Sequence, residues 1–444
     1  MDEMRRTRPR SSGRVALGIA LTAAFVMAPR AAAQEPSLPT MTLEQAIDAA
    51  LRHSPQIAQA TGAVENAEWG ERSAWGAYLP NLSFSSGASV SSSERFSTET
   101  NTVVRGASNE SYNAGLSASL DLFDGGRRRA ELRSARAEID AAQAGLIEQR
   151  FAVTLAVKQA FFDVLRGDEL IRAAQTRIDR AQEGLDAAEQ RAAVGSGTRS
   201  DVLRAQLELT NARQALLQAQ NQQRNATFTL GRLVGADGAV GAEATESYEP
   251  QPLALTREEL IELVVAEAPM VRTAVAELKA AEANARSARA QYFPTIDVGG
   301  RMRWSNNEPT FTNALNSWSL SLGLSFPLFN RFQRMSSVSN ASIQADVARV
   351  RLADARRAAR AQLEQALAAL DLAEQQVALT EEAVRVAEED LRVQQERYRL
   401  GVATILEQVT SQVNLVQAET DRIAARYDYQ IARAQVEALA GREL

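Results

Sequence analysis

Residues 318–328 read Trp-Ser-Leu-Ser-Leu-Gly-Leu-Ser-Phe-Pro-Leu, with an apolar side chain at almost every second position. Because successive side chains of a β-strand point to opposite faces, this alternation predicts a strand with one apolar and one polar face. A period of two over about ten residues is typical of a strand that crosses a membrane. A half-buried strand of a soluble sheet has the same pattern, so this stretch alone leaves both interpretations open.

Three further stretches alternate in the same way, over residues 82–90, 112–122 and 296–304. Tryptophan and tyrosine lie near the strand ends, as they do in the aromatic girdles of membrane barrels. We find no other strand pattern that could build a soluble sandwich. The membrane interpretation is therefore favoured, with the residues rich in Ser, Thr and Asn over 91–111 and 305–316 as outer loops.

The number of predicted strands carries a consequence for assembly. Four strands cannot close a membrane barrel, because bacterial barrels have at least eight. Open sheet edges cannot lie in lipid, since their backbone N–H and C=O groups would lack partners. Several chains must therefore share one barrel. Two chains would supply eight strands and three would supply twelve, and the alternation favours neither.

The segment from Arg127 to Val194 contains no proline and repeats apolar residues in steps of seven. The repeating positions are Leu132, Ile139, Leu146, Val153, Ala160, Ile171, Ile178, Leu185 and Ala192, flanked by Ala174, Ala181 and Ala188. Steps of seven predict a left-handed coiled helix pair, and small flanking residues let the helices approach closely. A single step of eleven after Ala160 unwinds the coil locally. At about 1.5 Å per residue, such a helix is on the order of 100 Å long.

The chain contains one unit twice. At an offset of 214 residues Thr42 aligns with Thr256, and at a later offset of 206 residues Gly195 aligns with Gly401. The second copy is therefore shorter between its strands, where a loop tip tolerates changes in length. The predicted domains are a signal peptide over 1–33, a first repeat over 34–235 with strands near 80–90 and 112–123, a linker over 236–255, and a second repeat over 256–444 with strands near 294–304 and 317–329.

The N-terminal residues are typical of a secretory signal peptide. Five arginines precede an apolar run from Val15 to Ala28, and three alanines then form a small-residue cleavage site before Gln34. The apolar run is too short to span a membrane comfortably. We expect cleavage between Ala33 and Gln34 and export of the mature chain.

The composition excludes several classes of protein. The 444 residues contain no cysteine and one histidine, His53, which excludes disulfides, thiolate ligands and multi-histidine metal sites. A net charge of −6 gives no overall basic footprint for nucleic acid. We expect no catalytic residues, no cofactor and no metal, and therefore not an enzyme. His53 precedes Ser54-Pro55 at a helix start, where a solvated or capping role is expected.

Two similar turns connect the predicted long helices to the helices that follow them. They span Val194–Leu203 (VGSGTRSDVL) and Tyr398–Glu407 (YRLGVATILE). The strand-entry segments 78–80 (YLP) and 292–294 (YFP) and the segment 122–126 (LFDGG) stand in the matching order. With these motifs the chain resembles the TolC-type outer-membrane efflux and secretion channels over essentially its whole mature length.

The resemblance implies an α+β membrane protein with an internal duplication. Long periplasmic coiled-coil helices would form an α-barrel, and four β-strands per chain would contribute to a shared trimeric transmembrane β-barrel. The implied function is passive export of small molecules across the periplasm and outer membrane. The implied partners are two further copies in a homotrimer, outer-membrane lipid, a periplasmic adaptor (membrane fusion) protein and an inner-membrane pump, with no nucleic acid. Without a cysteine after the signal peptide, we expect no acylation.

The resemblance also implies a periplasmic gate. Tyr398 matches the family's gate tyrosine and Asp201 its carboxylate partner, which predicts a Tyr398–Asp201 hydrogen bond. Glu407 matches an acid of the pore ring, where three copies would favour cations. Ala403 stands where the best-known member has a linking arginine, and Thr410 replaces a second acid. The closed state is therefore expected to be held less tightly or by other contacts.

The tip turns are expected to contact the adaptor. Gly195 and Gly401 are predicted to end the long helices in the left-handed conformation that glycine accepts. Thr198 and Thr404 are predicted N-caps of the returning helices. Two other functions stay open on the residues alone: a duct for type I protein secretion, and a structural periplasmic coiled-coil or adaptor protein.

Overall fold

The computed structural model describes residues 38–99, 101–106, 108–244, 248, 250–251 and 253–444. The chain divides into Met1–Leu38 and Pro39–Leu444, and the fold is that of the second unit. The predicted signal peptide over 1–33, with its cleavage site at Ala33 and Gln34, lies outside the described residues.

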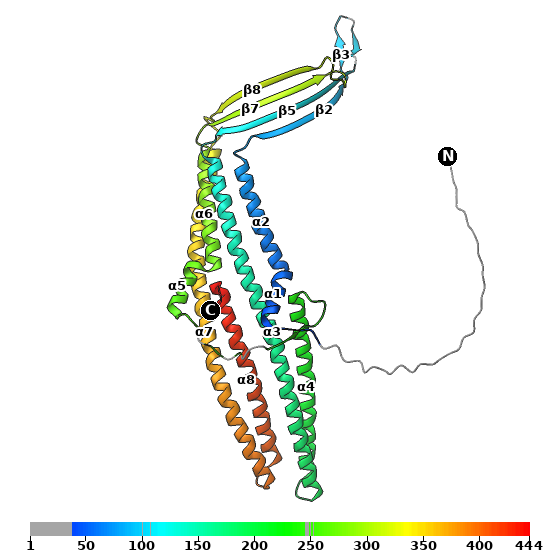
Figure 1. Ribbon diagram of the computed structural model, residues 1–444, viewed down its shortest axis with the longest axis vertical. Coiled ribbons are helices and arrows are strands. Elements are labelled where there is room, and N and C mark those ends of the chain that lie inside the picture. Colours follow the sequence, from blue (N-terminus) through cyan, green and yellow to red (C-terminus); the bar gives the residue numbers. More distant parts are fainter. Residues whose placement is uncertain (1–37, 100, 107, 245–247, 249, 252) are drawn as a thin grey trace, which may run out of the picture. The chain divides into compact units, whose positions relative to one another are not determined.

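The helices of the unit form two sets of equal lengths (Figure 1). The first set is α1 (Leu43–His53), α2 (Pro55–Gly76), α3 (Arg127–Ala193) and α4 (Arg199–Val234). The second set is α5 (Arg257–Glu267), α6 (Pro269–Ala290), α7 (Gln333–Arg399) and α8 (Ile405–Ala440). In both sets the lengths are 11, 22, 67 and 36 residues, which supports the interpretation as two repeats. No helix in the described ranges is both long enough and apolar enough to cross a membrane.

The short helices of both sets begin at the same local signals. Thr42 and Thr256 are N-caps whose hydroxyls accept a hydrogen bond from the third helical N–H, and the side chain of that third residue returns one. Pro55 and Pro269 open the next helices, at a position where a missing N–H breaks no intrahelical bond. The same signals therefore start the same elements in both halves.

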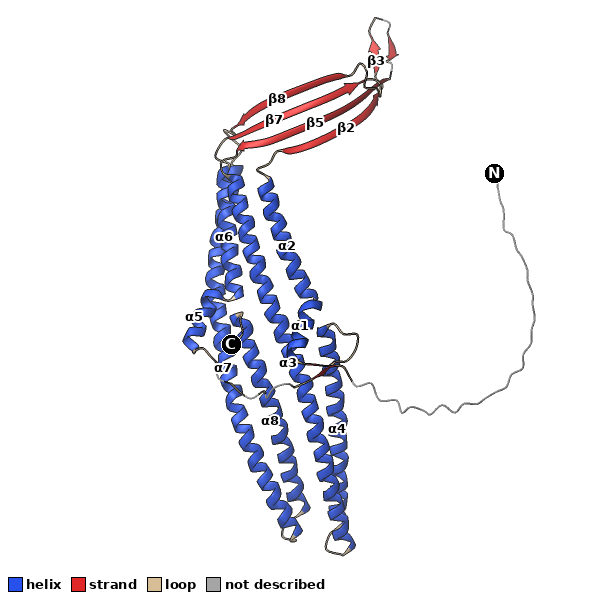
Figure 2. Ribbon diagram, viewed as in Figure 1, coloured by secondary structure: helices blue, strands red, loops and turns tan. Residues whose placement is uncertain are grey.

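Helix α3 is the centre of the helical packing. It packs against α2, α4, α6 and α8, and α7 packs against α6 and α8. Consequently α3 and α4 form a first hairpin and α7 and α8 a second (Figure 2). Beyond Gly167 the buried residues of α3 are the flanking Ala174, Ala181 and Ala188, whereas beyond Ala373 those of α7 are Val377, Val384, Leu391 and Tyr398. Alanines thus allow the close approach on α3, and larger side chains fill the contact on α7.

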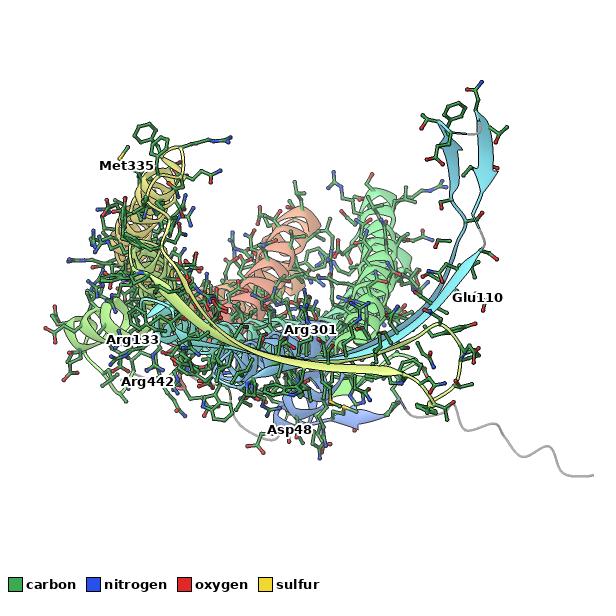
Figure 3. The ribbon with its side chains drawn as sticks, turned by 90° about the horizontal axis from the view of Figure 1, so that it is seen from above. Asp48, Glu110, Arg133, Arg301, Met335 and Arg442 are labelled. Atoms are coloured by element: carbon green, nitrogen blue, oxygen red, sulfur yellow. The ribbon has the colours of Figure 1, made fainter. Side chains whose placement is uncertain are left out.

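The long strands form an antiparallel sheet in the order β2-β5-β7-β8 (Figure 2). They are β2 (Asn81–Ser91), β5 (Asn109–Phe123), β7 (Thr295–Asn306) and β8 (Leu315–Ser325), and they overlap the four predicted stretches. β8 ends four residues before the predicted end at 329, because Pro327 has no N–H to continue the ladder. Seen from above, the sheet is curved (Figure 3).

The register places unlike side chains on the two faces of the sheet. Phe84, Leu116, Met302 and Trp318 are direct cross-strand neighbours in one apolar row. The next row reads Ser85, Gly115, Arg303 and Ser317. Leu320, Leu322 and Leu324 on the apolar face are each about 72–73% exposed, so no other described residue of the chain covers that face.

Two short strand pairs differ from the predicted organisation. Residues 91–111 are predicted as a plain outer loop, but they contain a hairpin of β3 (Glu94–Ser97) and β4 (Thr102–Arg105). The cross-strand pair Phe96–Val103 explains this hairpin, because aromatic and β-branched residues pair favourably across strands. In the predicted linker, β6 (Gly241–Ala242) pairs in parallel with β1 (Thr40–Met41).

Candidate functional site at the helix tips

Both hairpins turn through the same backbone motif. In the first, Gly195 has φ 75° and the N–H of Ser196 donates to the carbonyl of Arg191 at 2.9 Å. In the second, Gly401 has φ 78° and the N–H of Val402 donates to the carbonyl of Arg397 at 2.9 Å. These are Schellman turns, in which glycine accepts a conformation that strains other residues.

The returning helices begin at Thr198 and Thr404, where the sequence places them. Thr198 and Asp201 form a reciprocal cap: the hydroxyl of Thr198 accepts from the N–H of Asp201 at 3.2 Å, and the Asp201 carboxylate accepts from the N–H of Thr198 at 2.9 Å. Thr404 accepts from the N–H of Glu407 at 3.3 Å. In the described part of the chain, the Glu407 carboxylate returns no hydrogen bond and is exposed.

The predicted Tyr398–Asp201 hydrogen bond is wrong for this structure. The Asp201 carboxylate accepts a hydrogen bond from the N–H of Thr198, in the cap of its own helix. This bond stabilises the charged carboxylate and so lowers the pKa of Asp201. The Tyr398 hydroxyl is buried and has no hydrogen-bond partner among the described residues. Burial raises the pKa of Tyr398, so this hydroxyl stays protonated at neutral pH.

Arg191 joins the two tips, and the sequence interpretation missed it. Its guanidinium carbon lies 4.5 Å from the centre of the Tyr398 ring, a cation–π contact. Its Nη1 also donates to the Tyr398 carbonyl oxygen. The repeat offers a weak signal, because Arg397 aligns with Arg191. Among the described residues, however, the Arg397 side chain bonds only to Gln394 of its own helix. The link thus comes from α3 and not from position 403, which is alanine in this chain.

A cavity of about 520 Å³ lies between the tips. Gln190 and Arg191 of α3 line it on one side, and Tyr398 and Gln408 of the second hairpin on the other. Gln408 Oε1 and Gln412 Nε2 are buried and, like the Tyr398 hydroxyl, have no hydrogen-bond partner in the described ranges. An unsatisfied buried polar group costs about 1–3 kcal/mol. The second tip therefore gains free energy from any rearrangement that supplies partners.

Above the tips, polar contacts join α3 to α8. They are Lys158–Glu437 at 2.6 Å, Arg166–Asp428 at 2.6 Å, Arg180–Glu419 at 3.2 Å, and the Tyr427 hydroxyl donating to Glu169 at 2.8 Å. We call this row the α3–α8 ladder. It fixes the upper parts of the two hairpins to each other, so that a movement of the second hairpin is largest at its tip.

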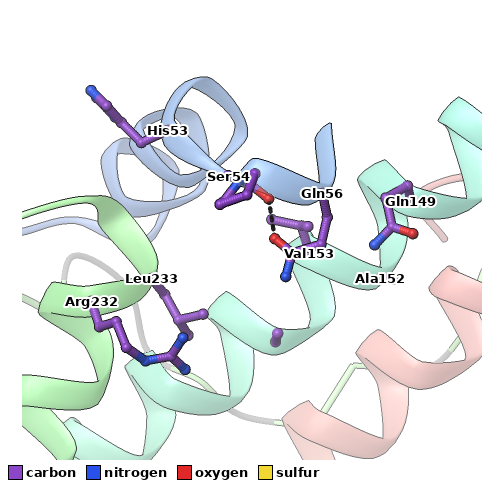
Figure 4. A pocket seen from close by; sticks show the side chains of 10 residues that line it. His53, Ser54, Gln56, Gln149, Ala152, Val153, Arg232 and Leu233 are labelled. Carbon is purple, nitrogen blue, oxygen red and sulfur yellow. Dashed lines mark hydrogen bonds between the residues drawn. The ribbon is translucent and has the colours of Figure 1, made fainter. Parts of the chain in front are cut away.

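A second cavity, of about 380 Å³, lies where α1 and α2 meet α3 and α4 (Figure 4). His53, Gln56, Gln149 and Arg232 are among its lining residues. His53 Nδ1 donates to the carbonyl oxygen of Ala49 at 2.8 Å, a bond within the last turn of α1. Nowhere in the described ranges do three His, Asp or Glu side chains gather so that they could hold a metal ion.

Long paired helices that end in polar tips and carry a sheet with one bare apolar face define the class of tunnel-forming outer-membrane channels. The chain belongs to the outer membrane efflux protein family, whose sequence pattern matches residues 46–236 and 260–442. It is an outer-membrane protein with a helical periplasmic extension. Members of the family and the structural neighbours are channel proteins rather than enzymes.

Individual proteins show the same relationship. Protein CyaE of Bordetella pertussis is 32% identical over 415 residues, which cover 90% of this chain and 82% of CyaE. The pyoverdine export outer membrane protein OpmQ of Pseudomonas aeruginosa is 24% identical over 390 residues, covering 86% of this chain and 81% of OpmQ. The crystal structure of CusC has the same fold, with a TM-score of 0.79 and 19% identity over 91% of this chain and 93% of CusC.

Proposed function

We propose that three copies of this chain form the outer-membrane duct of a tripartite efflux system, a passive channel for small molecules that opens when a periplasmic adaptor docks. The contact of Arg191 with Tyr398 beside unsatisfied polar groups carries this proposal, because it is a link between hairpins that is weak enough to be broken. The name of OpmQ, a pyoverdine exporter, supports small-molecule export.

The sheet supports the shared barrel. In the described part of the chain, the outer edges of β2 and β8 pair with no other strand. Such edges in lipid require partners from further chains. Three sheets joined edge to edge would close the barrel, with the row of Phe84, Leu116, Met302 and Trp318 toward lipid and the serine-rich face toward the lumen.

The gate follows from the tips. In the closed state Arg191 of α3 holds Tyr398 of α7, through a cation–π contact worth about 0.5–2 kcal/mol and a hydrogen bond. An adaptor that binds the turns around Gly195 and Gly401 can replace these contacts. The second hairpin then moves outward, and Gln408 and Gln412 acquire new partners.

Two measurements test the duct. In planar lipid bilayers, Tyr398→Leu, which removes the ring that Arg191 contacts, should raise conductance if the tips form the gate. Glu407→Gln should reduce cation preference, since an acidic ring favours cations. Unchanged conductance and selectivity in these variants would show that neither Tyr398 nor Glu407 acts in a gate or a pore ring.

Membrane insertion tests the barrel. Leu322→Arg should cost about 2–4 kcal/mol if Leu322 faces lipid near the midplane, whereas the neighbouring Ser321→Arg should insert normally. The reverse result would show that the two faces are assigned the wrong way round. A detergent-purified monomer that still conducts ions would contradict the shared barrel.

A further inference from the structure

Strand β7 carries two arginines on the polar face of the sheet. Arg301 lies between Ser117 of β5 and Ser319 of β8, and Arg303 lies in the next row of the same face. Because side chains alternate along a strand, both arginines point away from the apolar face that holds Met302. Figure 3 labels Arg301 on the curved sheet.

The neighbours of these arginines are small and uncharged. Arg303 is flanked by Gly115 and Ser317, and Ser117 bonds to Ser83 through their hydroxyls at 2.6 Å. Within the described ranges, the side chains of Arg301 and Arg303 make no hydrogen bond or ion pair with another residue, and both are exposed. Two positive charges about 7 Å apart along the strand therefore project from a surface of small serine and glycine residues.

The acidic groups of the same face do not neutralise them. Asp121 and Asp297 are cross-strand neighbours nearer the helical end of the sheet. The Asp121 carboxylate is paired with Arg127 at 3.3 Å. Asp297 lies four residues before Arg301, about 14 Å along the strand, which exceeds the Debye length of roughly 8 Å at physiological salt.

We propose that Arg301 and Arg303 form an anion-attracting belt in the lumen of the barrel, a site for solutes that carry carboxylate, phosphate or sulfate groups. This rests on the proposed trimeric duct, in which three chains contribute two arginines each. Guanidinium groups bind such anions through two parallel N–H donors, and rings of arginine or lysine are the known means of anion selection in pores. Export would then favour anionic solutes at its outer end.

The belt has a counterpart of opposite charge at the helix tips, at the far end of α7 from the sheet. Glu407 at the tip of the second hairpin is the acid of the predicted cation-favouring ring, whereas Arg301 and Arg303 favour anions. The two positions are separated by the whole length of α7, 67 residues or about 100 Å. At that distance salt screens the charges of one site from those of the other, so each site can be mutated without changing the electrostatic potential at the other.

The test is the reversal potential of single channels under a KCl gradient near 0.1 M, where the Debye length is about 10 Å. The double variant Arg301→Gln with Arg303→Gln should lower the chloride-to-potassium permeability ratio about sevenfold. A potential of about one kT, modest for clustered charges, raises the local chloride concentration about threefold and lowers the local potassium concentration by the same factor. The double lysine variant should keep the native ratio. Ser317→Gln with Ser319→Gln, which adds bulk without charge, should also keep it.

Pyrophosphate is the probe for the ligand class. Added to the native channel it should reduce the chloride current, and in the double glutamine variant it should not. A native channel whose ion selectivity and pyrophosphate response match those of the glutamine variant would overturn the belt while leaving the duct intact. Absence of any channel from the native protein would overturn the proposed duct and the belt together.

Discussion

The two hairpin tips share one backbone and differ in their polar side chains. Gly195 and Gly401 close equivalent turns, yet at the repeat offset of 206 residues Tyr398 corresponds to Ala192 and Gln408 to Val202. At these two positions the first tip thus carries a small and an apolar residue, beside a complete capping box. The second tip carries buried polar atoms that have no partner among the described residues.

The hairpins also differ in the polar contacts between their two helices, and again the first hairpin is the better bonded. In the first, both Arg177 Nε and Nη2 donate to Glu208 Oε1, at 3.0 and 2.7 Å, and this pair is largely buried between α3 and α4. The corresponding positions in the second hairpin are Ala383 and Asn414. The first hairpin is thus held by an internal ion pair whose positions carry alanine and asparagine in the second, and this difference supports the proposal that the second hairpin moves in the gate.

The largest expected effect comes from removing half of the buried pair. Glu208→Leu leaves Arg177 charged and unpaired, and breaking such a pair costs about 3–5 kcal/mol. Thermal unfolding of the detergent-solubilised protein should report this loss. Adding Arg177→Met should recover most of it, because an apolar pair of similar volume replaces the ion pair. A cost no larger than that of Asn414→Leu in the second hairpin would remove the distinction between the hairpins.

The next effect concerns the link between the tips. Arg191→Gln removes the cation–π contact and weakens the bond to the Tyr398 carbonyl, together about 2 kcal/mol per chain. Single-channel recording should show a larger open fraction. Arg397→Gln is the matched control, since the Arg397 side chain donates to Gln394 of its own helix. Equal behaviour of the two variants would mean that Arg191 does not hold the gate.

A smaller effect tests what the tips share. Gly195→Ala and Gly401→Ala both place a β-carbon at φ near 75–78°, which costs about 1 kcal/mol. Hydrogen exchange of the turn amides should accelerate to a similar degree in both variants. A clear inequality would show that the two turns are not energetically equivalent and would weaken the contrast drawn from side chains alone.

The smallest effect is a pH dependence confined to the first tip. The pKa of Asp201 lies below its ordinary value of 3.8, because the backbone N–H of Thr198 donates to the carboxylate. A carboxyl whose pKa is lower in the folded state contributes stability that is complete above pH 3.8 and is lost as the pH falls through the lowered pKa. Amide exchange at residues 199–202, corrected for its intrinsic pH dependence, should therefore show less protection below pH 4 (approximately the ordinary pKa). Asp201→Asn should keep the cap and lose this dependence.

Much of the fold follows from local patterns. Alternation over residues 318–328 and its three partners predicts the sheet, and steps of seven predict the long helices, because both periods express which face of an element is buried. Thr198, Thr404, Gly195 and Gly401 were predictable for the same reason: caps and left-handed turns depend on the residue and its immediate neighbours.

Contacts between segments that lie far apart in the sequence could not be predicted from local patterns. The sequence shows that Asp201 and Tyr398 both lie at the tips, but Asp201 is bound to the adjacent Thr198 and Arg191 reaches Tyr398. Which of several nearby polar groups forms a bond depends on a few ångströms of helix rotation and stagger. The β3–β4 hairpin was missed because its polar composition conceals a single apolar cross-strand pair.

The sequence by itself determined the two helical hairpins, the two-faced strands and the position of the tip turns, since each depends on periodicity or on residues within one turn of the chain. Only the tertiary structure decided that Arg191 links the tips, that α3 and α8 are joined by the α3–α8 ladder, and that Arg301 and Arg303 share the polar face with serine and glycine neighbours. The physical reason is that side-chain pairing is a short-range interaction. It is fixed only when packing sets the register between elements that lie hundreds of residues apart in the chain.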